Sequence, residues 1–209
     1  MTKKSKSYIF SKRFLDISIA IFALIVLSPV FLAVSLLYLY GANRGPVFYR
    51  QTRIGLNHKP FQIYKFRSMI VDADKKLYAN PDLYAKFVAN GYKLPTEEDP
   101  RITKLGAFLR KTSIDELPQF INILKGDMSI IGPRPVVENE LVEYGDRVDV
   151  FLSVRPGAMG LWQASGRSTI HYPERAELEI EYATHANMWF DFKIIFMTIR
   201  AIFKKVGAM

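Results

Sequence analysis

The run from Ile17 to Tyr40 contains no charged residue. A helix of about 20 apolar residues is enough to cross the ~30 Å hydrocarbon core of a membrane, and this run is longer than that. Ser28-Pro29 interrupts it near the middle. A proline inside a helix removes one backbone hydrogen bond and clashes with the preceding turn, so the pattern predicts a helix, a break and a second helix.

The flanks of this run allow two membrane topologies. Basic residues precede it within the first 13 positions, and more follow it; they are Lys3, Lys4, Lys6, Lys12, Arg13, Arg44, Arg50, Arg53, Lys59, Lys65 and Arg67. Positive charge favours the cytoplasmic side of a membrane. Because both flanks are basic, both are expected on the cytoplasmic side, which favours a re-entrant helix-break-helix that enters and leaves the membrane on one face. An ordinary kinked transmembrane helix stays open as the alternative, whereas the length of the run argues against a cleaved signal peptide.

Composition bounds the remaining possibilities. A chain of 209 residues suits one domain, or one domain with an anchor. The expected division is a basic arm with its membrane element at 1–43 and a catalytic domain at 44–209. A net charge of +9 fits anionic partners such as nucleic acid, phosphorylated metabolites or an anionic membrane. The absence of cysteine excludes disulfides and thiolate metal sites, and the three histidines are too widely spaced for a recognisable zinc pattern.

A cationic β-hairpin is expected over 45–69. Short alternating stretches flank a Gly55–Asn57 turn, and most of the polar positions are arginine or lysine, including Lys65 and Arg67. Such a face is either simply solvated or directed toward lipid head groups or a nucleotide diphosphate. Residues 70–99 predict one helix followed by a loop, in which Glu97, Glu98 and Asp99 are more simply solvated than metal-binding.

The stretch from 101 to 135 concentrates acidic, basic and rigid residues. An amphipathic helix is expected over 101–111, and Asp115 suits the N-cap of a second helix over 116–125 that stops at Gly126. Free N–H groups at such a helix start would stabilise the Asp115 anion. Taken alone, Asp115 and Glu116 are more often a cap and its solvated neighbour. Arg134, fixed between Pro133 and Pro135, suits phosphate binding or a structural corner.

The remainder predicts a charged helix over 136–152, a glycine-rich loop over 155–167, a helix over 173–187 and a basic, aromatic helix over 189–205. The last helix either lies in a membrane interface or packs into a core. Together these elements make an α+β fold: a re-entrant membrane helix-break-helix, a small and mostly helical catalytic domain with a short hairpin, and interfacial amphipathic helices.

A resemblance to one family covers nearly the whole chain. The colinear motifs are 12–16, the Ser28-Pro29 break, 45–50, 66–69, 99–110, 115–119, 132–135, 155–157, 161–163 and 166–167. They resemble the bacterial sugar transferases, monotopic phosphoglycosyl transferases that start membrane glycan assembly. The resemblance matches the family's catalytic unit without the extra N-terminal membrane helices of longer members.

The resemblance implies transfer of a sugar-1-phosphate from a UDP-sugar to undecaprenyl phosphate, with release of UMP. By family analogy Asp115 is the nucleophile that forms a phosphosugar–aspartate, and Glu116 binds Mg²⁺. Arg110, Arg134 and Arg167 match positions implicated in phosphate or nucleotide binding, and we add Lys65 and Arg67 as candidate substrate-binding residues. The implied location is the bacterial inner membrane, with the active site on the cytoplasmic face, in exopolysaccharide, capsule or O-antigen synthesis.

The sugar and the partners are less constrained. The 161–167 loop and the 207–209 end most resemble undecaprenyl-phosphate galactose phosphotransferases, which favours a hexose, galactose ahead of glucose. A membrane-tethered nucleic-acid binder is a rival, but the basic residues are spread out and no groove-reading motif is present, so no nucleic acid partner is expected. A non-catalytic scaffold of a polysaccharide assembly complex is the other alternative. A homodimer is also left open.

Overall fold

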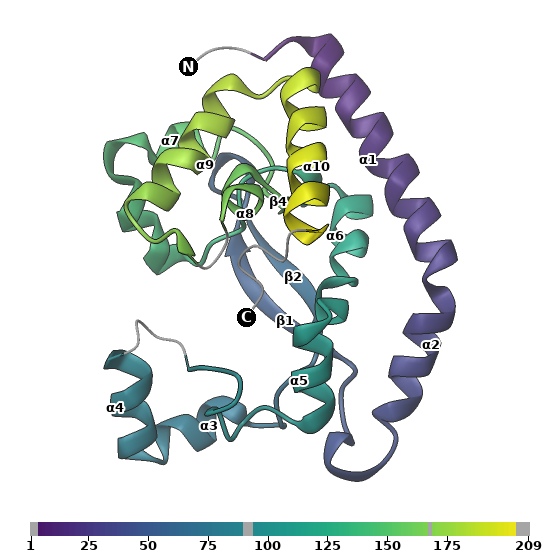
Figure 1. Ribbon diagram of the computed structural model, residues 1–209, viewed down its shortest axis with the longest axis vertical. Helices are drawn as coiled ribbons and strands as arrows, with labels where there is room; N and C mark the ends of the chain where they lie inside the picture. The colour runs from purple at the N-terminus through teal and green to yellow at the C-terminus, as the bar shows by residue number, and fades with distance from the viewer. Residues whose placement is uncertain (1–3, 90–93, 167–168, 204–209) are drawn as a thin grey trace. The chain divides into compact units, whose positions relative to one another are not determined.

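A computed structural model describes residues 4–89, 94–166 and 169–203. The chain divides into two compact units. Figure 1 shows the order of their helices and strands along the chain. Unit 1 comprises Met1–Ile25, Arg50–Ile63 and Gln119–Met209, and unit 2 comprises Val26–Tyr49 and Tyr64–Pro118.

The predicted helix-break-helix is present. One residue, Leu27, separates helix α1 (Lys6–Val26) from α2 (Ser28–Leu37), which carries Pro29 in its first turn. Its missing N–H costs nothing there, because the first turn of a helix has no intrahelical acceptor for it. Within the described residues no single helix is long and apolar enough to span a membrane. The two helices pass that test only as a pair, bent by 55° at the break.

The core of unit 1 is built on a two-stranded parallel sheet. Strand β3 (Ser129–Ile131) pairs with β4 (Gly157–Met159), with Ser129 opposite Gly157 and Ile131 opposite Met159. Apolar side chains from several helices cover it; these helices are α1, α6 (Gln119–Lys125), α8 (Leu161–Ser165), α9 (Glu174–His185) and α10 (Met188–Phe203). The expected glycine-rich loop over 155–167 is therefore wrong in part, since it contains β4 and α8.

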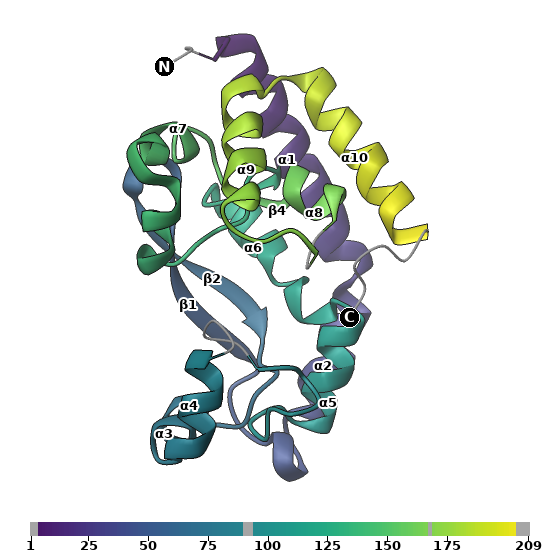
Figure 2. The same cartoon turned by 60° about the vertical axis from the view of Figure 1, so that its left-hand side comes forward.

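Helix α1 packs directly on this core (Figure 2). Asp16 accepts hydrogen bonds from the Ser129 hydroxyl at 3.0 Å and from the Ile130 main-chain N–H at 2.9 Å. Ala20 is fully buried among the core residues. The first half of the apolar run thus belongs structurally to unit 1.

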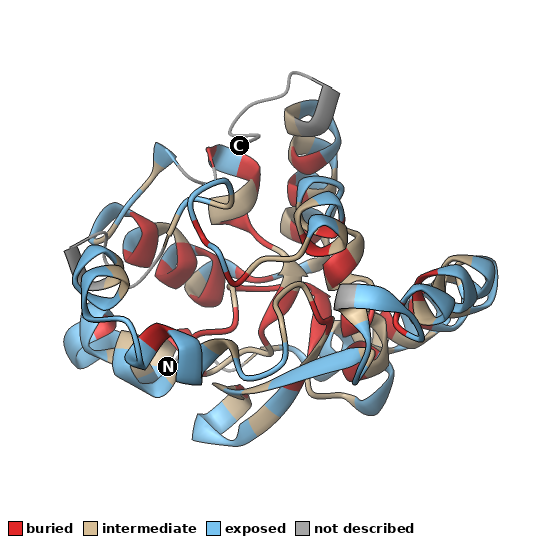
Figure 3. Cartoon of the chain, turned by 90° about the horizontal axis from the view of Figure 1, so that it is seen from below, coloured by how far each residue is buried: buried red, intermediate tan, exposed pale blue. Residues whose placement is uncertain are grey.

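Helix α10 packs into the core along one face, and its placement in a membrane interface stays a prediction. Ile194 is fully buried and Thr198 is 5% exposed, whereas Trp189 is 80% and Phe196 is 70% exposed. Figure 3 shows the same division along the helices, with buried positions on one side and exposed positions on the other. One face of α10 is core, and the other is an uncovered aromatic face.

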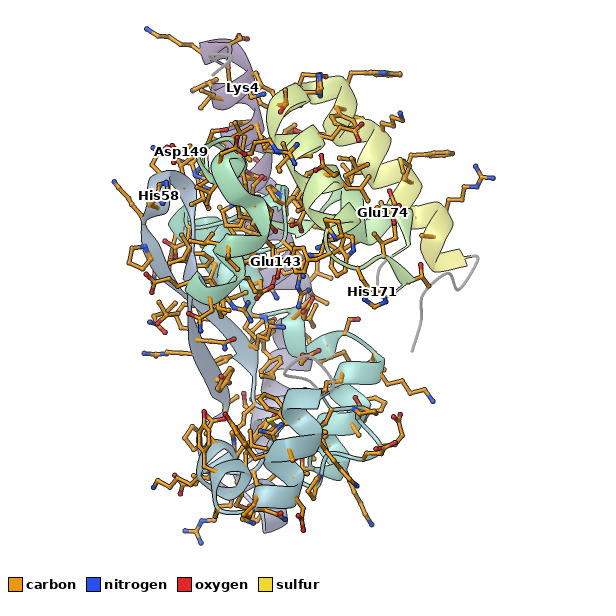
Figure 4. All side chains as sticks on the ribbon, turned by 90° about the vertical axis from the view of Figure 1, so that its left-hand side faces the viewer. Lys4, His58, Glu143, Asp149, His171 and Glu174 are labelled. Atoms are coloured by element: carbon orange, nitrogen blue, oxygen red, sulfur yellow. The ribbon has the colours of Figure 1, made fainter. Side chains whose placement is uncertain are left out.

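The single helix expected over 136–152 is wrong. This segment contributes to a second hydrophobic cluster of unit 1. The structure has a 3₁₀ helix η4 (Glu138–Arg147) followed by the short α7 (Val148–Phe151). The break falls at Gly145, whose φ of 54° is accessible to glycine at little cost. His58 and Asp149 lie 2.7 Å apart, which ties the hairpin turn to α7 (Figure 4).

The hairpin prediction is confirmed. Strands β1 (Phe48–Ile54) and β2 (Pro60–Phe66) pair with each other, and the connecting turn η2 (Leu56–His58) places Asn57 and His58 in the left-handed region.

Unit 2 holds the remaining elements, which are η1 (Gly41–Asn43), α3 (Ala73–Tyr78), α4 (Pro81–Ala89), α5 (Lys104–Lys111) and η3 (Ile114–Glu116). Val34, Tyr38, Phe66 and Leu109 form its core. The single helix expected within 70–99 is wrong, because a second one, α4, begins after Asn80. The Asn80 side chain accepts the Leu83 N–H at 3.1 Å and so starts α4.

Candidate active site

Asp115 lies in a single 3₁₀ turn rather than at the cap of a long helix. The N–H groups of Glu116 and Leu117 bond back to the carbonyls of Ser113 and Ile114 at 3.2 and 3.1 Å. Helix α6 begins only at Gln119. The expected start at 116 is therefore wrong. Leu117 has helical dihedral angles, but Pro118 has no N–H to donate to an i→i−4 hydrogen bond, so the regular helix starts after it.

Burial dominates the electrostatics of Asp115. The residue is 8% exposed, and burial raises the pKa of its carboxyl above the ordinary value. Lys65 opposes this shift most strongly, Glu116 adds to it, and Arg110 lowers the pKa again. The expectation that a helix N-terminus holds the anion is thus replaced by a different balance, in which nearby cations offset a desolvation cost.

Glu116 lies beside Lys65. The Lys65 Nζ donates to the Glu116 carboxylate at 2.7 Å, and the Glu116 side chain is 35% exposed. Lys65 comes from β2, 51 positions earlier in the chain. The hairpin therefore supplies the cation that balances both carboxylates.

Arg110 is positioned by a close approach of α5 to the Phe66–Met69 segment. Its Nε donates to the Ser68 hydroxyl at 2.9 Å, and the Ser68 carbonyl accepts the Thr103 N–H at 3.1 Å. A side-chain carbon at Gly106 would fall 1.8 Å from that carbonyl oxygen, so only glycine fits. Burial lowers the pKa of Arg110, while Asp115 raises it. Sequence reasoning missed Ser68, although it lies in one of the shared motifs.

The expectation of a solvated acidic loop is wrong for Asp99, which is buried, whereas Glu97 and Glu98 are exposed as expected. Asp99 is 5% exposed and forms a paired contact with Arg101, with distances of 2.8 Å to Nε and 2.7 Å to Nη2. Among the described residues no group of three or more histidine, cysteine or acidic side chains is arranged to hold a metal ion.

The Arg67 side chain binds main-chain carbonyls of the segment that precedes β1. Its Nε donates to the Pro46 carbonyl at 2.8 Å, Nη2 donates to the Asn43 carbonyl, and the guanidinium lies 5.2 Å from the centre of the Tyr38 ring. The Tyr38 hydroxyl in turn donates to the Arg67 carbonyl. These contacts give Arg67 a role in holding the 43–47 segment, and its substrate-binding role stays a prediction.

Two candidate residues remain. Arg134 belongs to unit 1, where its main-chain N–H donates to Glu179 at 3.1 Å and its guanidinium lies 5.9 Å from the centre of the Trp162 ring. Arg167 falls outside the described residues. Unit 2 thus brings together Asp115, Glu116, Lys65 and Arg110.

This combination defines a class of protein. A buried carboxylate, a more exposed carboxylate beside it and two nearby cations form a site suited to a transferase that handles phosphate groups, since fixed positive charge neutralises the group being transferred.

Comparisons with known proteins agree. The model of the bacterial sugar transferase family matches residues 7–205. The chain belongs to that family. It is 42% identical over 211 residues to the undecaprenyl-phosphate galactose phosphotransferase of Salmonella typhimurium, and 44% identical over 196 residues to the exopolysaccharide production protein ExoY of Sinorhizobium fredii. It is 40% identical over 198 residues to the UDP-glucose:undecaprenyl-phosphate glucose-1-phosphate transferase of Escherichia coli.

Coverage differs between these relatives. The matches take in 100%, 92% and 90% of this chain, respectively. They cover 43% of the Salmonella protein and 39% of the Escherichia coli protein, but 85% of ExoY. The chain therefore spans less than half the length of some relatives and most of another.

Proposed function

We propose that the chain transfers a sugar-1-phosphate from a UDP-sugar to undecaprenyl phosphate, giving undecaprenyl diphosphate sugar and UMP. Asp115 attacks the β-phosphorus, the bond to the UMP oxygen breaks, and a phosphosugar–aspartate forms. The phosphate of the lipid then attacks the same phosphorus and releases Asp115. The observation that carries this proposal is the buried Asp115 carboxylate with Lys65 and Arg110 acting on it.

Burial suits a nucleophile. A carboxylate that is 8% exposed has lost most of its water, which otherwise has to be removed before attack. Lys65 and Arg110 keep its ionised form accessible by lowering the pKa that burial raises. The same two cations offset the negative charge of an approaching diphosphate.

Glu116 fits a magnesium ligand. Its side chain is 35% exposed and carboxylate oxygen is a donor that Mg²⁺ prefers, and this ion usually takes only one or two protein carboxylates with substrate phosphates and water. Bound there, the ion would neutralise diphosphate charge. Lys65 already donates to Glu116, so it would share that carboxylate or turn toward the phosphate.

The membrane placement is supported by the helix pair. α1 and α2 pass the length and composition test together and are bent by 55°, which fits a re-entrant element entered from the cytoplasmic face. UDP-sugars are made in the cytoplasm, so we place the site on that face of the inner membrane. The uncovered aromatic face of α10 suits the same interface.

We favour galactose as the sugar, because the sequence of the 161–167 loop resembles that of undecaprenyl-phosphate galactose phosphotransferases. The names of the relatives include both a galactose and a glucose transferase, so the two hexoses are tested directly. ExoY is named for exopolysaccharide production, and that pathway is the one we favour.

The test is UMP release by the purified chain with undecaprenyl phosphate, Mg²⁺ and a panel of UDP-sugars. We expect turnover with UDP-galactose, loss of turnover in Asp115→Asn, and unchanged turnover in Asp82→Asn, an exposed aspartate on α4. Omission of Mg²⁺ should stop the reaction. A wild-type chain that releases no UMP from any UDP-sugar would favour the non-catalytic scaffold instead.

A further inference from the structure

The turn that carries Arg134 has an unusual main-chain anchor. Pro133 and Pro135 have no N–H, so the Arg134 N–H is the only main-chain donor between Gly132 and Val136. It donates to Oε1 of Glu179 at 3.1 Å. A side-chain carboxylate from α9 therefore holds the main chain of Arg134 itself.

The rest of the turn is held by other groups. The Gly132 N–H donates to the Met159 carbonyl at 2.9 Å, and the Gly157 N–H donates to the Pro133 carbonyl at 2.8 Å. Arg53 Nη1 donates to the Pro135 carbonyl at 3.2 Å. These hydrogen bonds hold the residues before and after Arg134. The contact with Glu179 is the one that holds the main chain of Arg134 itself.

Burial of the Glu179 carboxylate costs folding free energy. Glu179 is 1% exposed, and burial raises its pKa, while Arg175, at 3.5 Å, and the Tyr144 hydroxyl, which donates to it, favour its charge. Replacing a buried ionic group by an apolar one of similar size is often neutral for stability. Stability alone therefore gives a weak reason for a carboxylate here.

The guanidinium of Arg134 has a second restraint. It lies 5.9 Å from the centre of the Trp162 ring, and Arg175 lies 4.5 Å from the centre of the same ring. Arg175 is 5% exposed and is also held by Glu140 at 3.4 Å. Arg175 thus links Glu179 to the indole against which the Arg134 side chain lies.

We propose that Glu179 is a positioning residue that fixes the main chain of Arg134, so that the Arg134 guanidinium is held ready for the diphosphate of the sugar nucleotide. This rests on the proposed function for its ligand. The gain in affinity is entropic, because an arginine on a fixed main chain loses less conformational freedom when it binds phosphate.

The experiment measures the dissociation constant of UDP by calorimetry on the full chain. The variants are Arg134→Ala, Glu179→Met, which removes the acceptor at similar size, and the double variant. Glu177→Met is the matched control on the same helix, because Glu177 pairs with Arg147 at the exposed surface. Glu179→Gln is the rescue variant, since its amide oxygen can still accept from Arg134 while its NH₂ group turns to the Tyr144 oxygen.

We expect each of the first two single variants to weaken UDP binding roughly tenfold. The double variant should be no weaker than the worse single variant, because Glu179 acts through Arg134. Glu179→Gln should recover most of the affinity, and Glu177→Met should bind like the wild type. If Glu179→Met does not fold, Tyr144→Phe is measured in its place and should weaken UDP several-fold.

Independent effects that multiply in the double variant would overturn the proposal. So would wild-type affinity in Glu179→Met, or in Tyr144→Phe where that variant replaces it, or a wild-type chain that does not bind UDP. Turnover is measured separately. A chain that binds UDP in an Arg134-dependent way but releases no UMP from UDP-sugars would leave the positioning role standing and the proposed function refuted.

Discussion

Asp115 is a residue whose burial opposes its charge. Its pKa is raised in the folded chain, so the folded state prefers the protonated carboxyl more than the unfolded state does. The associated stability is present at low pH and is lost as the pH rises through the folded-state pKa. At neutral pH the ionised carboxylate therefore lowers stability, a cost often found at reactive groups.

Asp115→Asn should separate stability from activity. We expect turnover to fall by roughly 10³-fold or more, because the amide cannot form the proposed aspartyl intermediate. The melting temperature at neutral pH should rise by about 2–4 °C, the effect of about 1 kcal/mol in a chain of this size. Thermal denaturation at several pH values checks this, and the gain should shrink toward acid pH. A lower melting temperature at pH 7 would contradict the stated balance.

The Lys65 charge should be visible in the pH dependence of the reaction. Lys65 is the strongest of the groups that lower the Asp115 pKa. Lys65→Met therefore raises that pKa, and the acid limb of kcat/KM should move to higher pH, whatever the overall loss of rate. Lys104→Met removes an exposed lysine from the start of α5 and should leave the limb in place. If the acid limb of kcat/KM does not move in Lys65→Met, a group other than Asp115 or Lys65 determines its position.

At the scale of elements, the contact between α5 and Ser68 makes a sharp prediction. Alanine in place of a helical glycine normally stabilises by about 1 kcal/mol. At Gly106 the added carbon would fall 1.8 Å from the Ser68 carbonyl, so α5 has to move. We expect Gly106→Ala to destabilise by roughly 3 kcal/mol or more and to reduce turnover through Arg110.

Chemical denaturation measures this effect, and Ala107→Gly is its control. That variant lowers helix propensity at the neighbouring position and should cost only about 1 kcal/mol. A Gly106→Ala protein as stable as the wild type would show that the close approach is not required.

Local chemistry explains which elements were predictable from the sequence. The Gly55–Asn57 turn and the Ser28-Pro29 break carry their own signals, and both are present. The 116–125 helix was placed three residues too early, since the i→i+3 turn before Pro118 has no strong sequence pattern. Strand β4 was missed because its three residues gain their structure from pairing with β3.

The same distinction holds for the candidate site. The carboxylates and basic residues could be named from motifs, but the partners that set their chemistry come from distant positions. Lys65 meets Glu116 across 51 positions, and Arg110 meets Ser68 across 42. The raised pKa of Asp115 follows from burial, which no spacing of residues reveals.

At the scale of the whole molecule, the contacts of α1 bear on topology. Lys12 pairs with Asp191 of α10 at 2.8 Å, and Asp16 and Ala20 are buried against the β3 region. The N-terminal half of α1 is therefore part of unit 1. The chain from Ile21 to Leu37 lies at the short end of the roughly 17–25 residues that a span needs, and the re-entrant alternative stays a proposal.

The wild-type chain has no cysteine, so single-cysteine variants report topology without background. Ser7→Cys precedes the apolar run and Lys59→Cys follows it, and both positions are exposed. In intact bacterial spheroplasts a membrane-impermeant maleimide should label neither, and after lysis it should label both, because a re-entrant element returns to the cytoplasmic face. Leu32→Cys, an exposed position on α2, should stay unlabelled in both conditions if it lies in hydrocarbon. Labelling of one flank alone in intact spheroplasts would establish a full crossing, and the lipid phosphate would then have to reach Asp115 beside a transmembrane helix rather than a re-entrant one.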